Sequence, residues 1–366
     1  MNPFIPVTPD SSRSGLSCFG EVLQGRLARH PGIGRAFLIQ ENQLAKAEND
    51  RLIVDGLMAL ASFMPFGPGD YVFIDRSTEA GTLNGRLGLL QAACAPIGLP
   101  LRNIVYVSQT GGRVCPPTRP AGAYAPHWMF FNSYLMKFAR TYTNRDDPAP
   151  GVDCAGKVLC MNNKIRPHRI AVALMARRLC QERLILSWRG KTSIYSLEQA
   201  TTEFRKNFPS LSGESVMLEE RSLDVDADLG DVYGVPMGPA TESFLHIVTE
   251  SDYLPWSDRF TEKLLKPVVA GRPFLVFGPP RILQVFRSLG FRTFADVFDE
   301  SYDQTEEPEA RLVAIMRTLE DLLQRDYRAV LEQCAAVCVH NRRHLRFGLE
   351  DRLLGMLDRR LGEITG

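Results

Sequence analysis

Short apolar runs that each end in a polar turn, with helical spacing between them, most constrain the fold of this 366-residue chain. The first run covers residues 70–75, a helix is expected over 83–94, and the next run covers 103–108. Continuous apolar strands that alternate with helices are typical of parallel sheets covered on both faces. Such sheets bind ligands at the carboxyl ends of their strands. The pattern therefore predicts an α/β fold whose functional residues lie in the turns after strands.

The pattern restarts after residues 143–151, a charged, proline-rich stretch without periodicity that we interpret as a linker. At roughly 100–200 residues per domain, the chain length also predicts two domains. We expect a Rossmann-like domain over residues 1–150, with residues 1–40 as an extended arm, and a second one over 151–366 with a helical C-terminal segment. The further expected elements are helices at 44–63, 170–179 and 261–270, strands at 157–161, 184–188, 244–249 and 273–278, and helical chain from Pro308 onward.

The composition is that of an ordinary globular enzyme, with 45% apolar residues and a net charge of +1. It excludes a disordered chain and argues against a protein whose main task is to coat nucleic acid. Eight cysteines without a CxxC pair indicate reduced thiols, and the weak metal candidate of Cys334, Cys338, His340 and His344 lacks zinc-site spacing. We find no secretory signal and no apolar run of roughly 20 residues, so we expect a cytoplasmic protein without a transmembrane segment.

Thr261, Glu262 and Lys263 stand where the helix over 261–270 is expected to begin. Thr261 suits the N-cap, and the first turn of a helix favours an anion through its free N–H groups and its dipole. Lys263 would add a mobile positive charge for a diphosphate, while Glu262 can accept the two hydroxyls of a ribose. The alternative is a solvated charge pair at a helix start.

Residues 162–169 follow the first strand of the second domain and carry several cations and a histidine. This strand-to-helix turn is a candidate diphosphate site formed by Arg166, His168 and Arg169. An Arg guanidinium can donate two parallel hydrogen bonds to phosphate oxygens. The alternative is a solvated turn. Since the Asp-x-Asp triplets at 224–228 lie in an acidic loop, we expect no metal ion at the site.

Two carboxylates, Asp75 and Glu79, follow the first predicted strand and are candidates for a general base. Glu79 lies deeper in the turn and is the first choice. The alternative is that Asp75 caps the turn while Glu79 is exposed, and His127 is a further base candidate.

Glu250 and Tyr302 complete the set of candidate binding residues. Glu250 follows the strand over 244–249, where it would either reach the hydroxyls of a bound sugar or cap a turn. Tyr302 follows the last strand and would close the ligand pocket.

The segments Thr261-Glu262-Lys263, Ala270-Gly271-Arg272-Pro273 and Gly278-Pro279 together resemble the C-terminal lobe of the alpha-1,3-fucosyltransferase family. That family belongs to the two-Rossmann-lobe (GT-B) glycosyltransferases, and the chain is also similar to bacterial and phage glycosyltransferase-like proteins. The match covers roughly 40 residues. It implies the GT-B arrangement and a nucleotide-sugar donor, with the ribose held by Glu262 and the phosphates by Lys263. It also implies that a basic residue after the first strand of that lobe stabilises the leaving diphosphate without a metal.

The first functional hypothesis is therefore a glycosyltransferase, inverting and metal-independent, that moves a sugar from a nucleotide-sugar to a glycan or other acceptor hydroxyl. In this hypothesis the first domain holds the acceptor and Glu79 is the base. A second hypothesis is a non-catalytic module that binds nucleotides or glycans. A third has DNA as the acceptor, as in phage base glycosylation, although a net charge of +1 does not favour it. The sequence leaves the donor base, the sugar, the acceptor, the anomeric outcome and the oligomeric state open.

Overall fold

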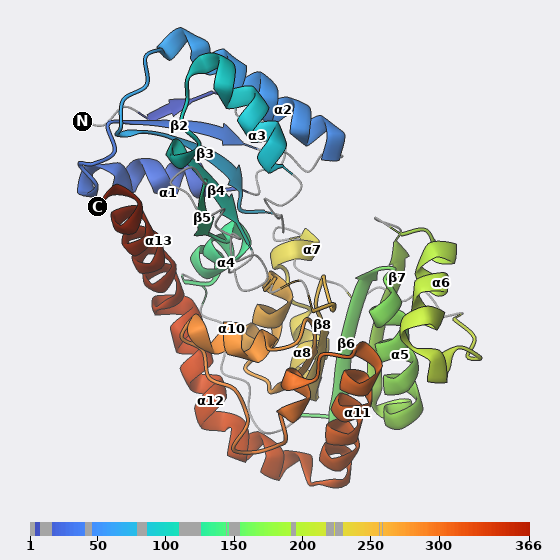
Figure 1. Ribbon diagram of the computed structural model, residues 1–366. Coiled ribbons are helices and arrows are strands. Elements are labelled where there is room, and N and C mark those ends of the chain that lie inside the picture. The colour runs from blue at the N-terminus through green and yellow to red at the C-terminus, as the bar shows by residue number, and fades with distance from the viewer. Residues whose placement is uncertain are drawn as a thin grey trace. The chain divides into compact units, whose positions relative to one another are not determined.

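The computed structural model divides into two compact units, each built on its own parallel sheet (Figure 1). The first unit comprises Met1–Lys137 with Glu350–Gly366, and the second Phe138–Leu349. The sequence pattern had assigned everything after residue 150 to the second domain, whereas the C-terminal residues group with the first unit. The structure describes residues 4–7, 17–40, 46–78, 86–109, 126–143, 145, 154–191, 195–216, 223, 230–255, 257 and 259–366.

The first unit contains a parallel sheet whose strands follow one another in the order β1-β2-β3-β4-β5. Alternate residues of β3 pack on opposite faces: Val72 and Ile74 join the core beneath α2 and α3, while Phe73 packs against Phe19 of α1. Figure 1 shows α2 and α3 on one side of this sheet and α1 on the other. The strands are β1 (Phe4–Pro6), β2 (Arg35–Gln40), β3 (Asp70–Arg76), β4 (Ile104–Ser108) and β5 (His127–Phe130). The helices are α1 (Phe19–Arg26), η1 (Leu27–Arg29), α2 (Lys46–Ala59), η2 (Leu60–Phe63), α3 (Leu87–Cys94), η3 (Ala95–Ile97), η4 (Leu101–Asn103), α4 (Ser133–Thr143), which crosses into the second unit, and α13 (Leu349–Thr365).

The prediction that residues 1–40 form an extended arm is wrong. β2 is an interior strand between β1 and β3, and α1 covers one face of the sheet. The physical reason is the run Ala36 to Ile39, whose four side chains are all buried. The glycine- and proline-containing stretch that directly precedes this run, residues 31–34, obscures it in the sequence.

An ion pair fixes the register at the start of β2 and β3. Arg35 and Asp70 are the first residues of the two strands and lie opposite each other. The Arg35 guanidinium donates to both carboxylate oxygens of Asp70, at 2.9 and 2.5 Å, and also to the carbonyls of Phe63 and Pro65. The hydrogen bond from Arg35 holds the pKa of the Asp70 carboxyl below its usual value, against the opposing effect of burial.

The second unit contains four parallel strands in the order β7-β6-β8-β9. The strands are β6 (Lys157–Lys164), β7 (Leu184–Lys191), β8 (Ser243–Thr249) and β9 (Phe274–Phe277), in agreement with the four predicted runs. The helices are α5 (Pro167–Cys180), η5 (Gln181–Arg183), α6 (Leu197–Asn207), η6 (Pro209–Leu211), α7 (Gly230–Tyr233), α8 (Met237–Glu242), η7 (Glu262–Leu264), α9 (Leu265–Ala270), α10 (Ile282–Ser288), η8 (Ser301–Gln304), α11 (Pro308–Gln324) and α12 (Tyr327–Phe347). The predicted fold class, two Rossmann-like α/β units with a helical C-terminal segment, is confirmed.

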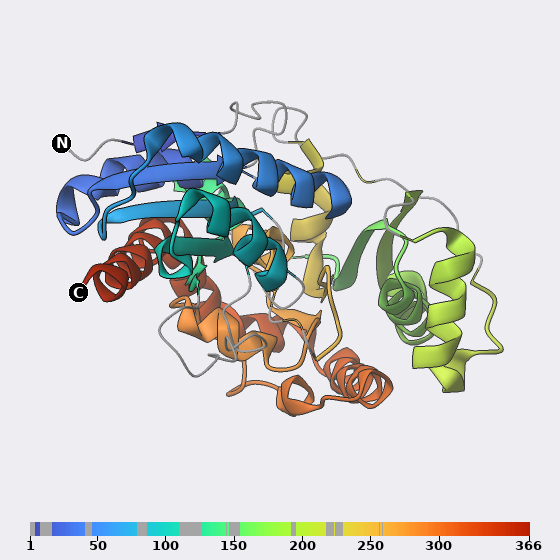
Figure 2. The ribbon, with the colours of Figure 1, turned by 45° about the horizontal axis from the view of Figure 1, so that its top comes forward.

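The strand order of the second sheet reverses at β6. The chain passes from β6 outward to β7, returns to the other side of β6 to form β8, and then continues outward to β9. Right-handed crossovers in opposite directions place their helices on opposite faces, and accordingly α5 packs with α6 and α11 while α9 packs with α12. Figure 2 shows α6 outside α5 at the β7 edge. The carboxyl ends of β6 and β8 therefore flank the one reversal among the described strands, which is where open α/β sheets bind ligands.

No helix among the described residues is long and apolar enough to cross a membrane.

The Arg35–Asp70 pair predicts a pH dependence of stability. Because the folded-state pKa of Asp70 is depressed, the stability it contributes is complete above the unfolded pKa of about 4 and is lost as the pH falls through the lower folded value. Asp70→Asn should therefore lower the free energy of unfolding by about 1–3 kcal/mol at pH 7, and the gap to wild type should narrow below about pH 4. Chemical unfolding of both proteins between pH 7 and pH 3 measures this gap.

Asp55→Asn is the matched control. Asp55 also pairs with an arginine, Arg51 at 3.6 Å, but the two side chains are 69% and 84% exposed. Such a pair contributes under about 1 kcal/mol. A gap between wild type and Asp70→Asn that stays constant down to pH 3 would contradict the assigned pKa direction.

Candidate functional site

The carboxyl ends of β6 and β8 are joined by side chains from both strands. The Thr249 hydroxyl, at the end of β8, donates to the Asn162 side-chain oxygen in β6 at 2.6 Å. The chain then leaves β6 at Lys164 and enters α5 at Pro167, while Glu250 follows β8 directly. The two segments that the sequence singled out, 162–169 and 250–263, therefore meet at this edge of the sheet.

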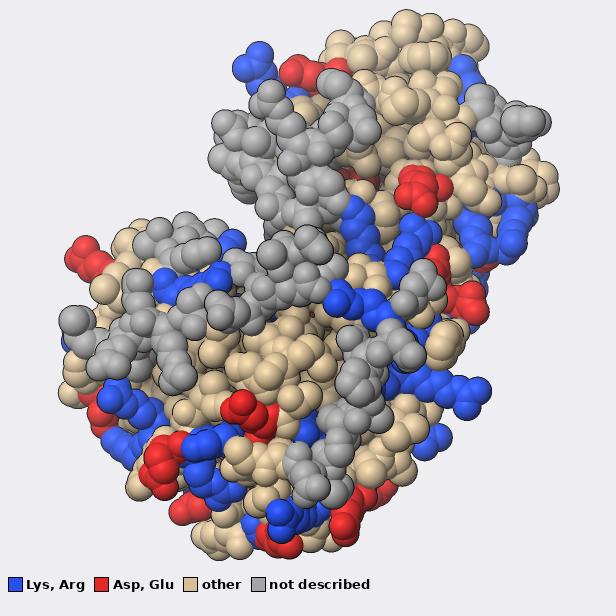
Figure 3. Space-filling view, turned by 180° about the vertical axis from the view of Figure 1, so that it is seen from behind, with Lys and Arg blue, Asp and Glu red and all other residues tan. Residues whose placement is uncertain are grey.

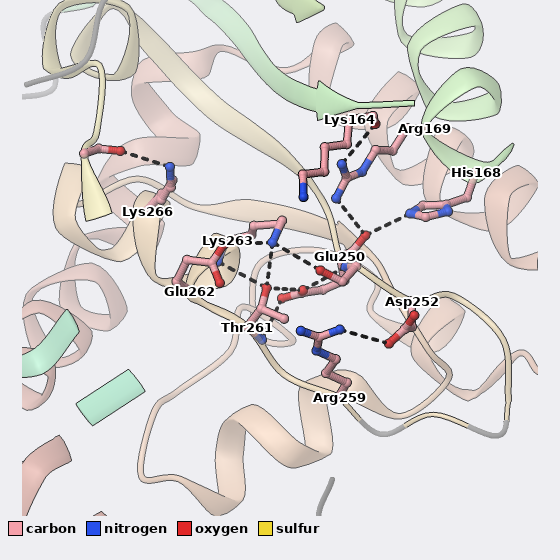
Figure 4. A network of polar contacts seen from close by, with 12 residues as sticks. Lys164, His168, Arg169, Glu250, Asp252, Arg259, Thr261, Glu262, Lys263 and Lys266 are labelled. Atoms are coloured by element: carbon pink, nitrogen blue, oxygen red, sulfur yellow. Dashed lines mark hydrogen bonds and ion pairs between the residues drawn. The ribbon is translucent and has the colours of Figure 1, made fainter. Parts of the chain in front are cut away.

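Glu250 connects these two segments through its backbone and its side chain (Figure 4). Its carbonyl accepts hydrogen bonds from His168 Nε2 at 2.8 Å and Arg169 Nη2 at 3.3 Å. Its carboxylate accepts the Thr261 hydroxyl at 2.5 Å and the N–H groups of Thr261 and Ser251 at 3.3 and 3.1 Å. The side chain has no exposed surface, and burial raises the pKa of the Glu250 carboxyl. These contacts correspond to the turn-capping alternative for Glu250.

The Thr261-Glu262-Lys263 segment opens a helix, as the sequence predicted. Thr261 is the N-cap of η7, and its hydroxyl oxygen accepts the N–H of Lys263 at 3.4 Å. The Lys263 ammonium donates to Glu262 Oε1 at 2.8 Å, Ser251 Oγ at 3.2 Å and Thr261 Oγ1 at 3.3 Å. Burial alone would raise the pKa of Glu262, but the neighbouring Lys263 outweighs it and the pKa is lowered. The Glu262 carboxylate is therefore ionised beside a partly exposed ammonium.

His168 and Arg169 are both buried in the first turn of α5. Burial, helped by the adjacent Arg169 charge, places the pKa of His168 well below its ordinary value, so the ring is neutral at pH 7. Burial and the Arg166 charge lower the pKa of Arg169 to about 10, which leaves it charged. Arg169 also donates to the Lys164 carbonyl at 3.1 Å. His168 therefore has no positive charge that could bind an anionic ligand. Arg169 carries a buried positive charge next to the candidate site.

A cavity of about 130 Å³ opens beside the two segments. Its walls come from the start of α5, from the chain after β8, and from one tyrosine that precedes α6. The lining residues are Arg166, Pro167, His168, Tyr195, Ser251, Asp252, Tyr253 and Leu254. Ser251 both lines the cavity and accepts a hydrogen bond from Lys263, so the cavity and the Thr261-Glu262-Lys263 segment adjoin.

Arg311 supports this wall of the cavity and was missed by the sequence interpretation. It lies in α11 with 1% of its surface exposed, donates to the carbonyls of Tyr253 and Thr305, and stacks 5.2 Å from the Phe277 ring centroid. The signal in the sequence is its position four residues before Ile315, on the apolar face of the helix. An arginine in an apolar stripe must find buried acceptors, and here they are backbone carbonyls.

Tyr302 is not among the residues that line the cavity. It is buried in η8, where its hydroxyl oxygen accepts the N–H of Val276 in β9 at 3.5 Å. Burial raises the pKa of the Tyr302 hydroxyl well above its ordinary value, so it is a neutral core group. The structure brings together Arg166, His168, Arg169, Glu250, Thr261, Glu262 and Lys263, but not Tyr302.

Asp75 lies at the carboxyl end of β3 in the first unit, surrounded by hydroxyl groups. It is 2% exposed and accepts hydrogen bonds from the Ser17 hydroxyl at 2.6 Å, the Ser77 N–H at 2.9 Å and the Gln40 amide at 3.4 Å. The bond from Ser77 is the turn cap that the sequence left open as an alternative. His127 is the first residue of β5, with its ring 6.4 Å from Tyr71 near the start of β3. Glu79 lies outside the described residues, as do the Asp-x-Asp triplets at 224–228.

Within the part of the chain that the structure describes, no group of three or more His, Cys, Asp or Glu side chains has the arrangement of a metal site. His340 and His344, which the sequence suggested beside Cys334 and Cys338, donate instead to the carbonyls of Gly290 and Leu289.

Comparison with known proteins assigns the chain to no family. No protein-family model matches the chain, and a search of curated proteins finds no match. One similar solved structure is the alpha,alpha-trehalose 6-phosphate synthase of Burkholderia multivorans, with a TM-score of 0.48 and 10% sequence identity. The alignment covers 99% of this chain and 98% of that one.

The Thr261–Glu250 hydrogen bond predicts a stability effect. Thr261→Val removes the hydroxyl while keeping the shape, which leaves the buried Glu250 carboxyl without one of its donors. We expect the free energy of unfolding to fall by about 1–3 kcal/mol in urea denaturation. Thr261→Ser, which keeps the hydroxyl, should recover most of the loss. Equal stability of the Val and Ser variants would show that this bond does not matter.

Proposed function

We propose that this protein is a glycosyltransferase and that its second unit binds the nucleotide-sugar donor. One observation carries the proposal: the cations of the 162–169 and 261–263 segments converge at the strand-order reversal between β6 and β8. The same edge carries a helix N-terminus and an adjoining cavity. The resemblance of the Thr261-Glu262-Lys263 segment to fucosyltransferases supports a nucleotide-sugar as the ligand.

The donor diphosphate would bind to Lys263 and Arg166. Arg169 is buried and would attract the diphosphate through its positive charge without direct contact. Lys263 suits this role because its side chain is 28% exposed and its ammonium is already held by three oxygen acceptors. Little conformational freedom is therefore lost when a phosphate binds. Arg166 is the N-cap residue of α5 and lines the cavity. When the sugar is transferred, negative charge grows on the leaving diphosphate, and fixed cations stabilise it without reorganisation.

Glu262 would accept hydrogen bonds from the ribose hydroxyls, since its carboxylate is ionised at neutral pH and offers only acceptors. Glu250 and Thr261 would act through the segments they hold, because their polar groups already bond to each other. For the general base of an inverting transfer we retain Glu79 as the first choice, since the Asp75 carboxylate is occupied by hydroxyl and backbone donors.

The net charge of +1 and the face of the molecule shown in Figure 3 give no support to DNA as the acceptor. On the face that Figure 3 shows, Asp and Glu lie among the Lys and Arg side chains rather than apart from them. A DNA-binding surface would be expected to gather cations on one face.

Lys263→Ala tests the donor site. Removing the ammonium should weaken the binding of nucleoside diphosphates by about tenfold or more and abolish sugar transfer, because a charge-assisted contact is lost. Calorimetric titration with GDP, UDP, CDP, ADP and dTDP measures binding, and thermal unfolding checks the fold.

Lys206→Ala is the matched control, since Lys206 is an exposed lysine in the last turn of α6 and is not among the cavity-lining residues. Wild-type affinity in the Lys263→Ala variant would remove the donor-site assignment. If wild type binds a nucleotide but neither transfers nor hydrolyses the corresponding sugar donor, the protein is instead a non-catalytic nucleotide-binding module.

A further inference from the structure

The cavity beside α5 is close to a single aromatic ring in size. Its volume of about 130 Å³ is slightly below the roughly 150 Å³ of a cavity that binds one benzene molecule. Two tyrosines, Tyr195 and Tyr253, line it together with Pro167 and Leu254. Tyr253 is held rigidly, since its ring lies 4.5 Å from that of His168 and its carbonyl accepts from Arg311. This aromatic and apolar part of the lining suits a flat ring, while Arg166, His168, Ser251 and Asp252 form the polar part.

Asp252 is the acidic residue among those that line the cavity. Its side chain is 32% exposed, and its internal contacts are weak: Ser257 Oγ lies at 3.3 Å and Arg259 Nη1 at 3.9 Å. The carboxylate therefore keeps acceptor capacity for a ligand that offers N–H groups. The same charge repels a phosphate, so a diphosphate would bind at Arg166 and Lys263 rather than beside Asp252.

Lys263, which would bind a phosphate, and Asp252, which would repel one, are separated in space. Figure 4 shows Glu262 and Lys263 on one side of Glu250, and His168 and Asp252 on the other. Ser251 joins the two sides, because it accepts from Lys263 and also lines the cavity. A ligand that spans both would place its anionic part at Lys263 and its uncharged ring at Asp252.

We propose that the cavity binds the nucleobase of the donor and that Asp252 is a specificity-determining residue, accepting a hydrogen bond from an N–H on the edge of the base. This rests on the proposed function for the presence of a nucleotide, and it assigns the base to a defined pocket. Bases differ in where they carry N–H donors, so one acceptor at the end of a ring-sized cavity discriminates among them.

Asp252→Asn tests the assignment, because it keeps the shape and removes the charge. The dissociation constants of GDP, UDP, CDP and ADP, and of pyrophosphate as a base-free probe, are measured by calorimetry for wild type and variant. We expect the tightest-binding nucleotide to lose about tenfold or more, since a hydrogen bond to a charged acceptor is lost. Pyrophosphate should bind the variant as well as or better than wild type, because a repelling charge is gone.

Ser257→Ala is the control, since it removes one of the two internal contacts of Asp252 and leaves the carboxylate in place. Its nucleotide affinity should stay within about twofold of wild type, because Ser257 is not among the residues that line the cavity. An Asp252→Asn variant with unchanged nucleotide affinity, or one that weakens nucleotide and pyrophosphate equally, overturns the assignment. If pyrophosphate does not bind wild type, the nucleotide result alone decides. A wild-type protein that binds no nucleoside diphosphate refutes the proposed function itself, which is a separate outcome.

Discussion

The second unit depends on one buried group, the carboxyl of Glu250, which has no contact with solvent and must be satisfied from within. Thr261 and the backbone of Ser251 supply its donors, so the 261–263 segment is held against the end of β8. The carbonyl of the same residue holds the start of α5 through His168 and Arg169. The candidate diphosphate site therefore exists because one residue fixes two segments that are far apart in the sequence.

In this arrangement, the residues that hold the two segments in place differ from those that are available to bind a ligand. The buried members, Glu250, Thr261 and Arg169, have most of their polar atoms committed to each other or to backbone groups. Among the groups that retain exposed surface are Lys263 on one side of Glu250, Asp252 on the other, and Arg166 at the start of α5. The opposite charges of Lys263 and Asp252 suit the two ends of a nucleotide, an anionic diphosphate and an uncharged base with N–H donors. We regard this polarity as the feature that most favours a nucleotide over a simple anion.

Much of the fold followed from the sequence, because buried parallel strands are continuous apolar runs. The strands β3, β4, β6, β7, β8 and β9 were all expected within a few residues of their bounds. β2 was missed because its short apolar run directly follows a stretch with glycine and proline residues. The order β7-β6-β8-β9 could not be predicted, since strand order arises from long-range pairing that leaves no local signal.

The candidate site could be predicted to the extent that its residues directly follow strands. Tyr302 also follows a strand, yet its hydroxyl points into the core, a direction that spacing does not reveal.

Hydrogen–deuterium exchange of the whole protein with and without a nucleoside diphosphate tests the central claim most directly. The account predicts slower exchange in peptides that cover residues 162–170 and 250–264, because a bound nucleotide would order both segments around Glu250. Peptides from β3 and the turn after it should exchange at an unchanged rate when the donor nucleotide alone is present. Protection confined to the first unit, or no protection at saturating nucleotide, would contradict the account.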